Sequence, residues 1–383
     1  MATLSGGVAP AQQVAPGEFI PGTGLASGQV LAVVPAAGDA NLPIDAGFTA
    51  ARFRNDTGDG DAGTLRLGLI GSLLTTSTCG REPSIRPGSL PDASVLHLNS
   101  SDGDQSATTE YPPTGSGAGT QSGTVRSGSY SEFEARPGVF DVPNVIRIGG
   151  GVSHSVAELV PDQQRRAVAS TEIGSLSVLG GVVELRGLRW HASHVSFAEG
   201  TTPEVAGAFT MDEIVVPPLP PMPVSSPDAL QSAIDLVNAV LGRLFVTMVL
   251  PEVTTAPNGA MVVSPLRVIV SGGDASAALI RPLLGDPAAD RARRELANLL
   301  FLQGCEGPLA ETDYPRIAGG VNTVSDVVIA GLLGSGGVTL EIGGASAGTE
   351  ARRFDNPFGS GDPLLVPPVV ASAGVNPPPA AST

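Results

Sequence analysis

The chain has 383 residues, of which 42% are hydrophobic but only 4% aromatic, so its cores must be built from valine, leucine, isoleucine and alanine. It carries 50 glycines and 34 prolines, a composition typical of many short strands joined by turns. All 21 basic residues are arginine, which excludes chemistry that needs a lysine amine, and the net charge of −16 argues against a nucleic-acid groove.

The first part of the chain divides by composition into an arm and a β-rich region. Residues 1–30 are rich in glycine, proline and alanine, which predicts a flexible N-terminal arm. Residues 31–150 are predicted to be β-rich, with alternating strand patterns at 48–53 and 64–74. Within this region, residues 99–131 are rich in serine, glycine and threonine and predict a long polar surface loop.

The acidic turn expected between these two strands carries oxygen ligands at alternate positions, Asn55, Thr57, Asp59 and Asp61. Calcium takes roughly six to eight oxygen ligands, often from a flexible loop of this kind. The EF-hand pattern is not met, because Gly68 stands where a bidentate glutamate is required. The sequence therefore favours a plain polar hairpin turn, with a calcium loop formed by these four residues as the alternative. No other cofactor is expected.

Residues 151–224 give the clearest strand pattern and predict a β domain, in which 172–183 and 183–197 form one long alternating ribbon. The second half would place Leu188, Trp190, Ala192 and His194 on one face and Arg189, His191, Ser193 and Val195 on the other. His191 and His194 have an HxxH spacing that would suit a zinc site on a helix. On a strand they point to opposite faces, so no metal site is predicted here.

Residues 225–355 follow an extended proline-rich link, 217–223, and predict an α+β domain. Ser226 can cap a helix, followed by Pro227 and Asp228 in its first turn. The apolar stripe of this helix comprises Leu230, Ile234, Val237, Leu241 and Leu244. The other predicted elements are strands at 244–250, 259–271 and 337–342 and helices at 286–302 and 322–332. Residues 356–383 are predicted to form a proline-rich tail.

The chain has two cysteines, Cys79 and Cys305, and neither has a metal-ligand spacing. In an oxidising compartment they could form one long-range disulfide between the N-terminal region and the C-terminal half. Two unrelated buried thiols are the alternative.

No segment has the pattern of a membrane span or of a secretory signal. No apolar run reaches about 18 residues, so no transmembrane helix is expected. The first 17 residues lack a charged n-region and an apolar h-region. The chain is therefore expected to be either cytoplasmic or the mature form of an exported protein.

Motifs for catalysis are missing from the sequence. There is no GxSxG elbow and no GxGxxG or GxxxxGK[ST] loop, and neither cysteine has a histidine near it in sequence. His97 and His154 have no supporting cysteine or histidine nearby. No catalytic residue is assigned, and a non-enzymatic protein is expected.

Two short patterns resemble a family of exported proteins. Residues 175–185, SLSVLGGVVEL, resemble the V-x-L-L-G-G-L-V-x-A strand motif of actinobacterial secreted proteins labelled choice-of-anchor. Residues 250–251 and 263–266, LP and VSPL, resemble the L-P-x-V…V-x-V-S-P-L pattern of the same proteins. The resemblance covers roughly residues 150–350 and implies export, a β-rich ectodomain and no assigned catalysis. This chain shows neither a signal peptide nor a C-terminal anchor, which suggests a released protein or a subunit held by its neighbours.

Together these features predict a mainly β protein with a few helices (α+β), a β-sandwich or layered sheets with an extended arm and tail. We expect a non-enzymatic structural subunit of a bacterial surface or secreted assembly, such as a fibre, sheath or coat, outside the cell. Its partners would be further copies or other surface subunits, on which the arm and tail could dock as added strands. The alternatives are a monomeric secreted binding module (for polysaccharide, ligand or calcium), a hydrolase with an unrecognised site and a phage structural protein.

Overall fold

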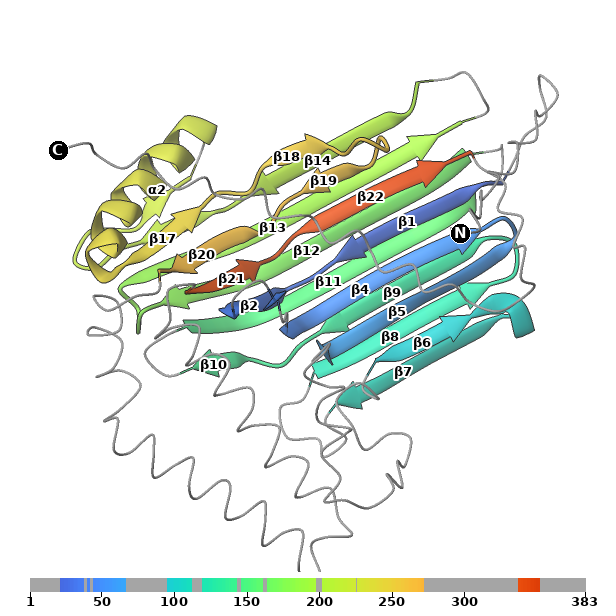
Figure 1. Cartoon of the computed structure of the whole chain (residues 1–383), viewed down its shortest axis with the longest axis horizontal. Coiled ribbons are helices and arrows are strands. Elements are labelled where there is room, and N and C mark those ends of the chain that lie inside the picture. The colour runs from blue at the N-terminus through green and yellow to red at the C-terminus, as the bar shows by residue number, and fades with distance from the viewer. Residues whose placement is uncertain are drawn as a thin grey trace, which may run out of the picture. The chain divides into compact units, whose positions relative to one another are not determined.

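Alternating side chains along the strands build two antiparallel sheets that face each other (Figure 1). The computed structural model describes residues 21–37, 40–41, 44–66, 95–111, 119–142, 146–160, 164–197, 202–224, 226–271 and 337–351. All of them belong to one compact unit, Met1–Arg353. The two ends of this unit form one sheet, here sheet 1, and its middle forms the other, sheet 2. The mainly β, sandwich-like fold predicted from the sequence is confirmed.

The strands of sheet 1 are β1 (Thr23–Gly28), β2 (Leu31–Ala37), β3 (Ala40–Asn41), β4 (Ile44–Arg54), β5 (Thr57–Arg66), β6 (Leu96–Asn99), β17 (Val246–Val249), β18 (Val253–Thr255), β19 (Met261–Val263), β20 (Leu266–Val270), β21 (Val338–Ile342) and β22 (Ala345–Glu350). The strands of sheet 2 are β7 (Gln105–Tyr111), β8 (Gly119–Arg126), β9 (Tyr130–Arg136), β10 (Phe140–Val142), β11 (Ile146–Val160), β12 (Gln164–Val178), β13 (Val183–Ser196), β14 (Glu204–Thr210), β15 (Glu213–Val215) and β16 (Met222–Pro223). The described helices are α2 (Pro227–Leu241) and the short 3₁₀ segments η2 (Ser100–Asp102) and η3 (Gly242–Leu244).

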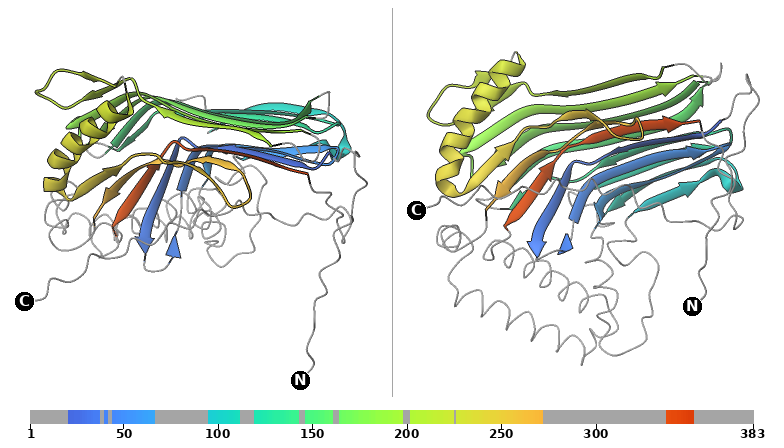
Figure 2. Two further views of the ribbon diagram at one scale, coloured as in Figure 1. Left: turned by 90° about the horizontal axis from the view of Figure 1, so that it is seen from above. Right: turned by 45° about the horizontal axis from the view of Figure 1, so that its top comes forward.

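Sheet 1 is built from ribbons that are interrupted partway along their length. The continuous strand β4 pairs with β2 near its start and with β1 over the rest of its length. On the other side of this ribbon, β21 pairs with β2 and β22 pairs with β1. Beyond them, β20 pairs with β21 and β19 pairs with β22. The three interruptions lie beside one another, at 29–30, 343–344 and 264–265. Figure 2 shows the strands beyond them turning away from sheet 2 at the end where α2 lies. The interruptions therefore mark a bend across the sheet.

Glycine permits this bend in the ribbon between β21 and β22. Gly343 and Gly344 have φ values of 72° and 121°, in the region that favours glycine. A Cβ on Gly343 would lie 2.5 Å from ring atoms of Trp190, so the indole packs directly on the backbone. Trp190 Nε1 also donates to the carbonyl of Ser264 at 3.2 Å. One buried side chain from sheet 2 thus contacts two of the three interruptions in sheet 1.

The interior between the sheets contains two hydrophobic clusters. The larger surrounds Trp190 and includes the buried face of α2, and the smaller surrounds Phe133. Between them along β11 lie Ser153 and Ser155, whose hydroxyl oxygens are 2.7 and 2.8 Å from Thr49 Oγ1 on β4. These buried hydroxyls satisfy one another across the two sheets, as buried polar groups must. The sandwich therefore has a polar band between its two apolar regions.

Helix α2 begins where the sequence predicts. The Ser226 hydroxyl accepts a hydrogen bond from the backbone N–H of Ala229 at 3.2 Å, and Pro227 occupies the first turn. Ile234, Val237 and Leu241 of the expected stripe are buried. The predicted apolar face of this helix is confirmed, while Leu244 falls in η3 instead. No helix in the described ranges is long and apolar enough to cross a membrane.

The prediction of a flexible arm over residues 1–30 is wrong for its last part. Residues 23–28 form β1, which lies between β4 and β22 in the interior of sheet 1. Ala26 is buried, and Gly24 faces the Phe53 ring so closely that a Cβ would lie 2.3 Å from it. Small residues are needed here because the strand packs in a crowded interior. Residues 1–20 and the expected tail at 356–383 lie outside the described residues.

The predicted polar loop at 99–131 is also wrong. This segment contains β7 and β8, and β8 alternates buried and half-buried residues along most of its length. Its inward positions include Gly119, Gly123 and Val125, and a Cβ on Gly123 would lie 2.4 Å from the Phe133 ring. The Phe133 ring fills the space at Gly123 that a large side chain of β8 would otherwise fill, so this buried strand lacks the large apolar residues that would reveal it in the sequence.

The boundaries predicted at 150/151 and 224/225 do not separate independent units. Sheet 1 contains strands from both sides of these boundaries, at 31–66, 246–270 and 338–350. Sheet 2 likewise crosses the first boundary, with strands at 105–142 and 146–223. The proline-rich link is not extended throughout, because Leu219 N donates to Val216 O at 2.9 Å and closes a turn. The helices expected at 286–302 and 322–332 lie outside the described residues.

Candidate functional site

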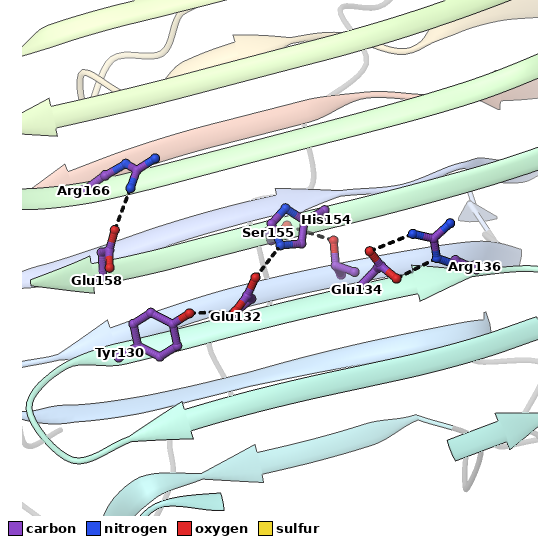
Figure 3. Close-up of polar contacts among 9 residues, drawn as sticks. Tyr130, Glu132, Glu134, Arg136, His154, Ser155, Glu158 and Arg166 are labelled. Carbon is purple, nitrogen blue, oxygen red and sulfur yellow. Dashed lines mark hydrogen bonds and ion pairs between the residues drawn. The ribbon is translucent and has the colours of Figure 1, made fainter. Parts of the chain in front are cut away.

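Several groups of polar contacts lie on the outer face of sheet 2 (Figure 3). Strand alternation directs Tyr130, Glu132, Glu134 and Arg136 of β9 to this face. The Tyr130 hydroxyl donates to Glu132 at 2.6 Å, and His154 Nε2 of β11 lies 2.9 Å from the other Glu132 oxygen. Arg136 pairs with Glu134 through two donors at 2.6 and 3.0 Å. The result is a cluster in which each carboxylate already has a donor.

The contact between Tyr130 and Glu132 shifts the pKa values of both side chains. The hydrogen bond from Tyr130 is the main factor that lowers the pKa of Glu132, and His154 acts in the same direction. Burial, together with the neighbouring Glu132 carboxylate, raises the pKa of Tyr130 to about 12. The phenol therefore remains a proton donor over the whole physiological range.

Because Tyr130 ionises at about 12 in the folded protein and at about 10 in the unfolded chain, the native state holds its proton more tightly. This contribution to stability is present below pH of about 10 and is lost as the pH rises toward 12. We expect the free energy of unfolding to fall less steeply between pH 9 and pH 11 in Tyr130→Phe than in the wild type, measured by urea denaturation. Equal slopes in the two proteins would contradict the assigned contact.

Beside this cluster the outer face is hollowed, with a volume of about 310 Å³. Its lining is polar and comes from β7, β8, β9 and β11: Ser106, Thr108, Ser122, Thr124, Glu132, Glu134 and His154, with Ala107 and Gly123. Ser106 and Thr124 share a hydrogen bond at 3.0 Å. Hydroxyls, carboxylates and an imidazole can bind a polar ligand through hydrogen bonds. Within this hollow the imidazole of His154 contacts the Glu132 carboxylate.

The strand register places His154 and His191 on the same face of sheet 2, with strand β12 between them. His154 of β11 and His191 of β13 both lie opposite Ser170 of β12. The second histidine of the HxxH pair, His194, points the other way and is buried. The prediction that strand geometry separates His191 from His194 is therefore confirmed.

His194 lies between the sheets and contacts Thr349 of β22, with Nδ1 and Oγ1 2.9 Å apart. Burial lowers the pKa of this imidazole, and a hydrogen bond with the Gly259 backbone only partly opposes the effect. The folded protein thus prefers the neutral ring, whereas the unfolded chain binds a proton below pH of about 6.5. Stability from this group is present above that pH and is lost as the pH falls.

We expect the free energy of unfolding to decrease less between pH 7.5 and pH 5.5 in His194→Gln than in the wild type, measured by urea denaturation. His191→Gln is the matched control, because His191 is exposed on the opposite face of the same strand. It should keep the wild-type pH dependence. If the two variants behaved alike, the assignment to His194 would be wrong.

The candidate calcium residues are arranged as a strand and not as a loop. Only 55–56 form the turn, and Thr57, Asp59 and Asp61 lie on β5. Arg52 of β4 donates to Asp59 at 2.8 Å and to Asp61 at 2.7 Å. A guanidinium between the two carboxylates occupies the place that a cation would take, although burial still raises the pKa of Asp59. The plain hairpin turn that the sequence favours is therefore confirmed, and the curled acidic loop of the calcium alternative is not formed.

His97 lies in the cluster around Arg52, and the two cysteines fall outside the described residues. His97 Nδ1 lies 2.7 Å from Asp61 Oδ1, so this histidine belongs to the same cluster as Arg52. The described part of the chain holds no group of three histidine, cysteine or acidic residues placed to bind a metal ion. Cys79 and Cys305 both lie outside the described residues, so the disulfide stays a prediction.

Two strands form long edges of sheet 2. In the described structure β7 pairs with β8 alone and β14 pairs with β13 alone, and each has seven residues. Natural sheets commonly protect such edges with charged residues or proline. Neither QSATTEY nor EVAGAFT contains proline, and each has a single charged residue, Glu110 or Glu204. Both edges therefore present a strand on which another chain could pair.

Comparison with known proteins identifies no relative, because no family model, no curated protein and no solved structure matches the chain.

Proposed function

We propose that this protein is a non-enzymatic structural subunit of a bacterial surface or secreted assembly, and that copies associate through the edges of sheet 2. The observation that carries the proposal is the pair of seven-residue strands, β7 and β14, that form the two edges of sheet 2 among the described residues. A strand edge offers a row of backbone donors and acceptors, and pairing along it extends the sheet into the next molecule. Two such edges on one sheet permit growth in both directions.

The rigidity of the sandwich supports the same role. β11, β12 and β13 have 14 or 15 residues each, so each spans roughly 45–50 Å at about 3.3 Å per residue. Long paired strands that pack over a filled interior resist deformation, which favours a structural role over a catalytic one. The resemblance of residues 175–185 to exported actinobacterial proteins supports a location outside the cell.

The proposal is tested by light scattering after size-exclusion chromatography, followed by electron microscopy of the purified full chain. We expect species larger than the 38.4 kDa monomer that increase with concentration. A single 38.4 kDa species at every concentration would contradict assembly.

Edge variants make the test specific. Consecutive residues of an antiparallel strand direct their N–H groups to opposite sides. One of Thr108→Pro and Thr109→Pro therefore removes a donor from the β7–β8 ladder and lowers the melting temperature. The other removes an outward donor, leaves the melting temperature close to that of the wild type and is expected to reduce growth at the β7 edge.

A second candidate function is binding of a polar ligand in the hollow on sheet 2. The convergence of Glu132, Glu134 and His154 with several hydroxyls favours it. Titration with neutral oligosaccharides, monitored by calorimetry, tests this candidate. Binding that is lost in Glu134→Gln but kept in Glu184→Gln, on a distant part of the same outer face, would support it.

A further inference from the structure

The β14 edge differs from the β7 edge in the side chains that it exposes. Val205 of β14 and Val253 of β18 are 41% and 47% exposed. Phe209 lies on the same inward side of β14 and packs against Trp190, with the ring centroids 4.9 Å apart and the planes tilted by 47°. In β7 the described side chains on the inward side are those of Gln105, Ala107 and Thr109. Of the two edges, β14 therefore gains more from being covered, because covering it removes apolar surface from water.

The two sheets meet along this edge. Gly207 of β14 faces sheet 1 so closely that a Cβ would lie 2.6 Å from Met261 Sδ and 2.7 Å from Val253 Cγ1. Figure 1 shows β14 beside β18 along one margin of the structure. The apolar strip formed by Val205, Phe209, Val253 and Met261 thus lies at the open seam of the sandwich.

The sequence of β14, EVAGAFT, is nearly symmetric about Gly207. If two copies of β14 run antiparallel with their Gly207 residues opposite, Ala206 of each lies opposite Ala208 of the other. Val205 then lies opposite Phe209, and Glu204 opposite Thr210. Small residues meet on the outer face, apolar residues meet on the inner face, and no two carboxylates are placed opposite each other, which would be unfavourable.

The direction of the strands favours the same arrangement. Sheet 2 is antiparallel throughout, and β7 and β14 are separated by an even number of strand-to-strand steps, so they run in the same direction. Contact between β14 and β7 by simple translation would therefore form a parallel pair. Two copies of β14 related by a two-fold axis form an antiparallel pair, which continues the existing pattern.

We propose that a second copy of this chain docks on β14, with the two strands antiparallel about a two-fold axis at Gly207. The inference rests on the proposed function and specifies one of its contacts. The pairing of the two β14 strands joins the two copies of sheet 2 into one continuous sheet and covers Val205 and Val253 at the seam.

Cysteine cross-linking tests the register directly. Full-length Ala206→Cys and Ala208→Cys proteins are each oxidised alone and as an equal mixture, and the linked peptides are identified by mass spectrometry. A 206–208 link is expected in the mixture. In either protein alone the equivalent cysteines are offset by two residues, which exceeds the roughly 7 Å limit between Cα atoms, so no link is expected.

A substitution at an exposed position tests the apolar contact without disturbing the core. Val205→Asp places a carboxylate opposite Phe209 of the second copy and is expected to weaken dimerisation at least tenfold. Val139→Asp is the matched control, because Val139 is also an exposed valine (60%) but lies away from β14. It should dimerise like the wild type.

The outcomes separate this inference from the proposed function. Assembly by light scattering without a 206–208 link overturns the β14 register and leaves the proposed function standing. A monomer at all concentrations overturns both. A linked dimer that does not grow further supports the β14 contact and contradicts an extended assembly.

Discussion

Replacement of Trp190 by alanine is expected to lower the free energy of unfolding by about 3–5 kcal/mol, the range for truncating a fully buried aromatic residue. Trp190 is 1% exposed and packs on Gly343, Phe209 and the backbone of sheet 1. Its removal leaves a cavity at the bend, and the Ser264 carbonyl loses its indole donor. Urea denaturation followed by circular dichroism gives the change.

Two further variants separate the causes of this loss. Trp190→Phe keeps an aromatic ring but removes the donor to Ser264, so it should be less damaging than alanine. Gly343→Ala introduces a Cβ at a positive φ and 2.5 Å from the indole, and should destabilise the wild type more than it destabilises Trp190→Ala. An alanine variant as stable as the wild type would show that the bend does not depend on this ring.

The pattern around Trp190 was also the part of the fold best predicted from the sequence. In residues 188–192, the apolar residues Leu188, Trp190 and Ala192 alternate with Arg189 and His191, and period-two alternation of this kind is typical of a strand buried on one side. The start of α2 was predicted equally well, because Ser226 and Pro227 act through local hydrogen bonding and backbone geometry. Both features depend on residues close together in sequence.

Features that depend on distant partners were missed. β1 has the sequence TGLASG, which shows no strand pattern, and its pairing with β22 joins residues more than 300 positions apart. β8 was missed because its buried positions include glycines instead of large apolar residues. In both cases a nearby phenylalanine sets the need for a small residue, and the sequence alone does not reveal which phenylalanine faces which glycine.

The candidate site depends on register in the same way. Glu132 and His154 are 22 residues apart, and nothing in either local sequence links them. Alternation along β9 could have placed Tyr130, Glu132 and Glu134 on one face, had this segment been recognised as a strand. The edges were beyond sequence reasoning, because an edge is defined by the order of strands in the sheet.

The second large effect is expected at Phe133, in the smaller hydrophobic cluster. This ring is fully buried between Gly60 of β5 and Gly123 of β8, whose added Cβ atoms would lie 2.3 and 2.4 Å from it. Phe133→Ala is expected to lower the free energy of unfolding by about 3–5 kcal/mol, because the glycines cannot fill the cavity. Urea denaturation measures the loss, and light scattering shows whether the β7 edge, which lies next to β8, still assembles.

The paired glycine supplies the control that distinguishes tight packing from simple burial. Gly123→Ala alone should cost about 1–3 kcal/mol by crowding the ring. In combination with Phe133→Leu, which presents a smaller and more adaptable side chain, the added methyl group should be tolerated, so the two changes should be less damaging together than the sum of their separate effects. Strict additivity would mean that the Phe133 ring does not pack against the Gly123 backbone on the neighbouring strand.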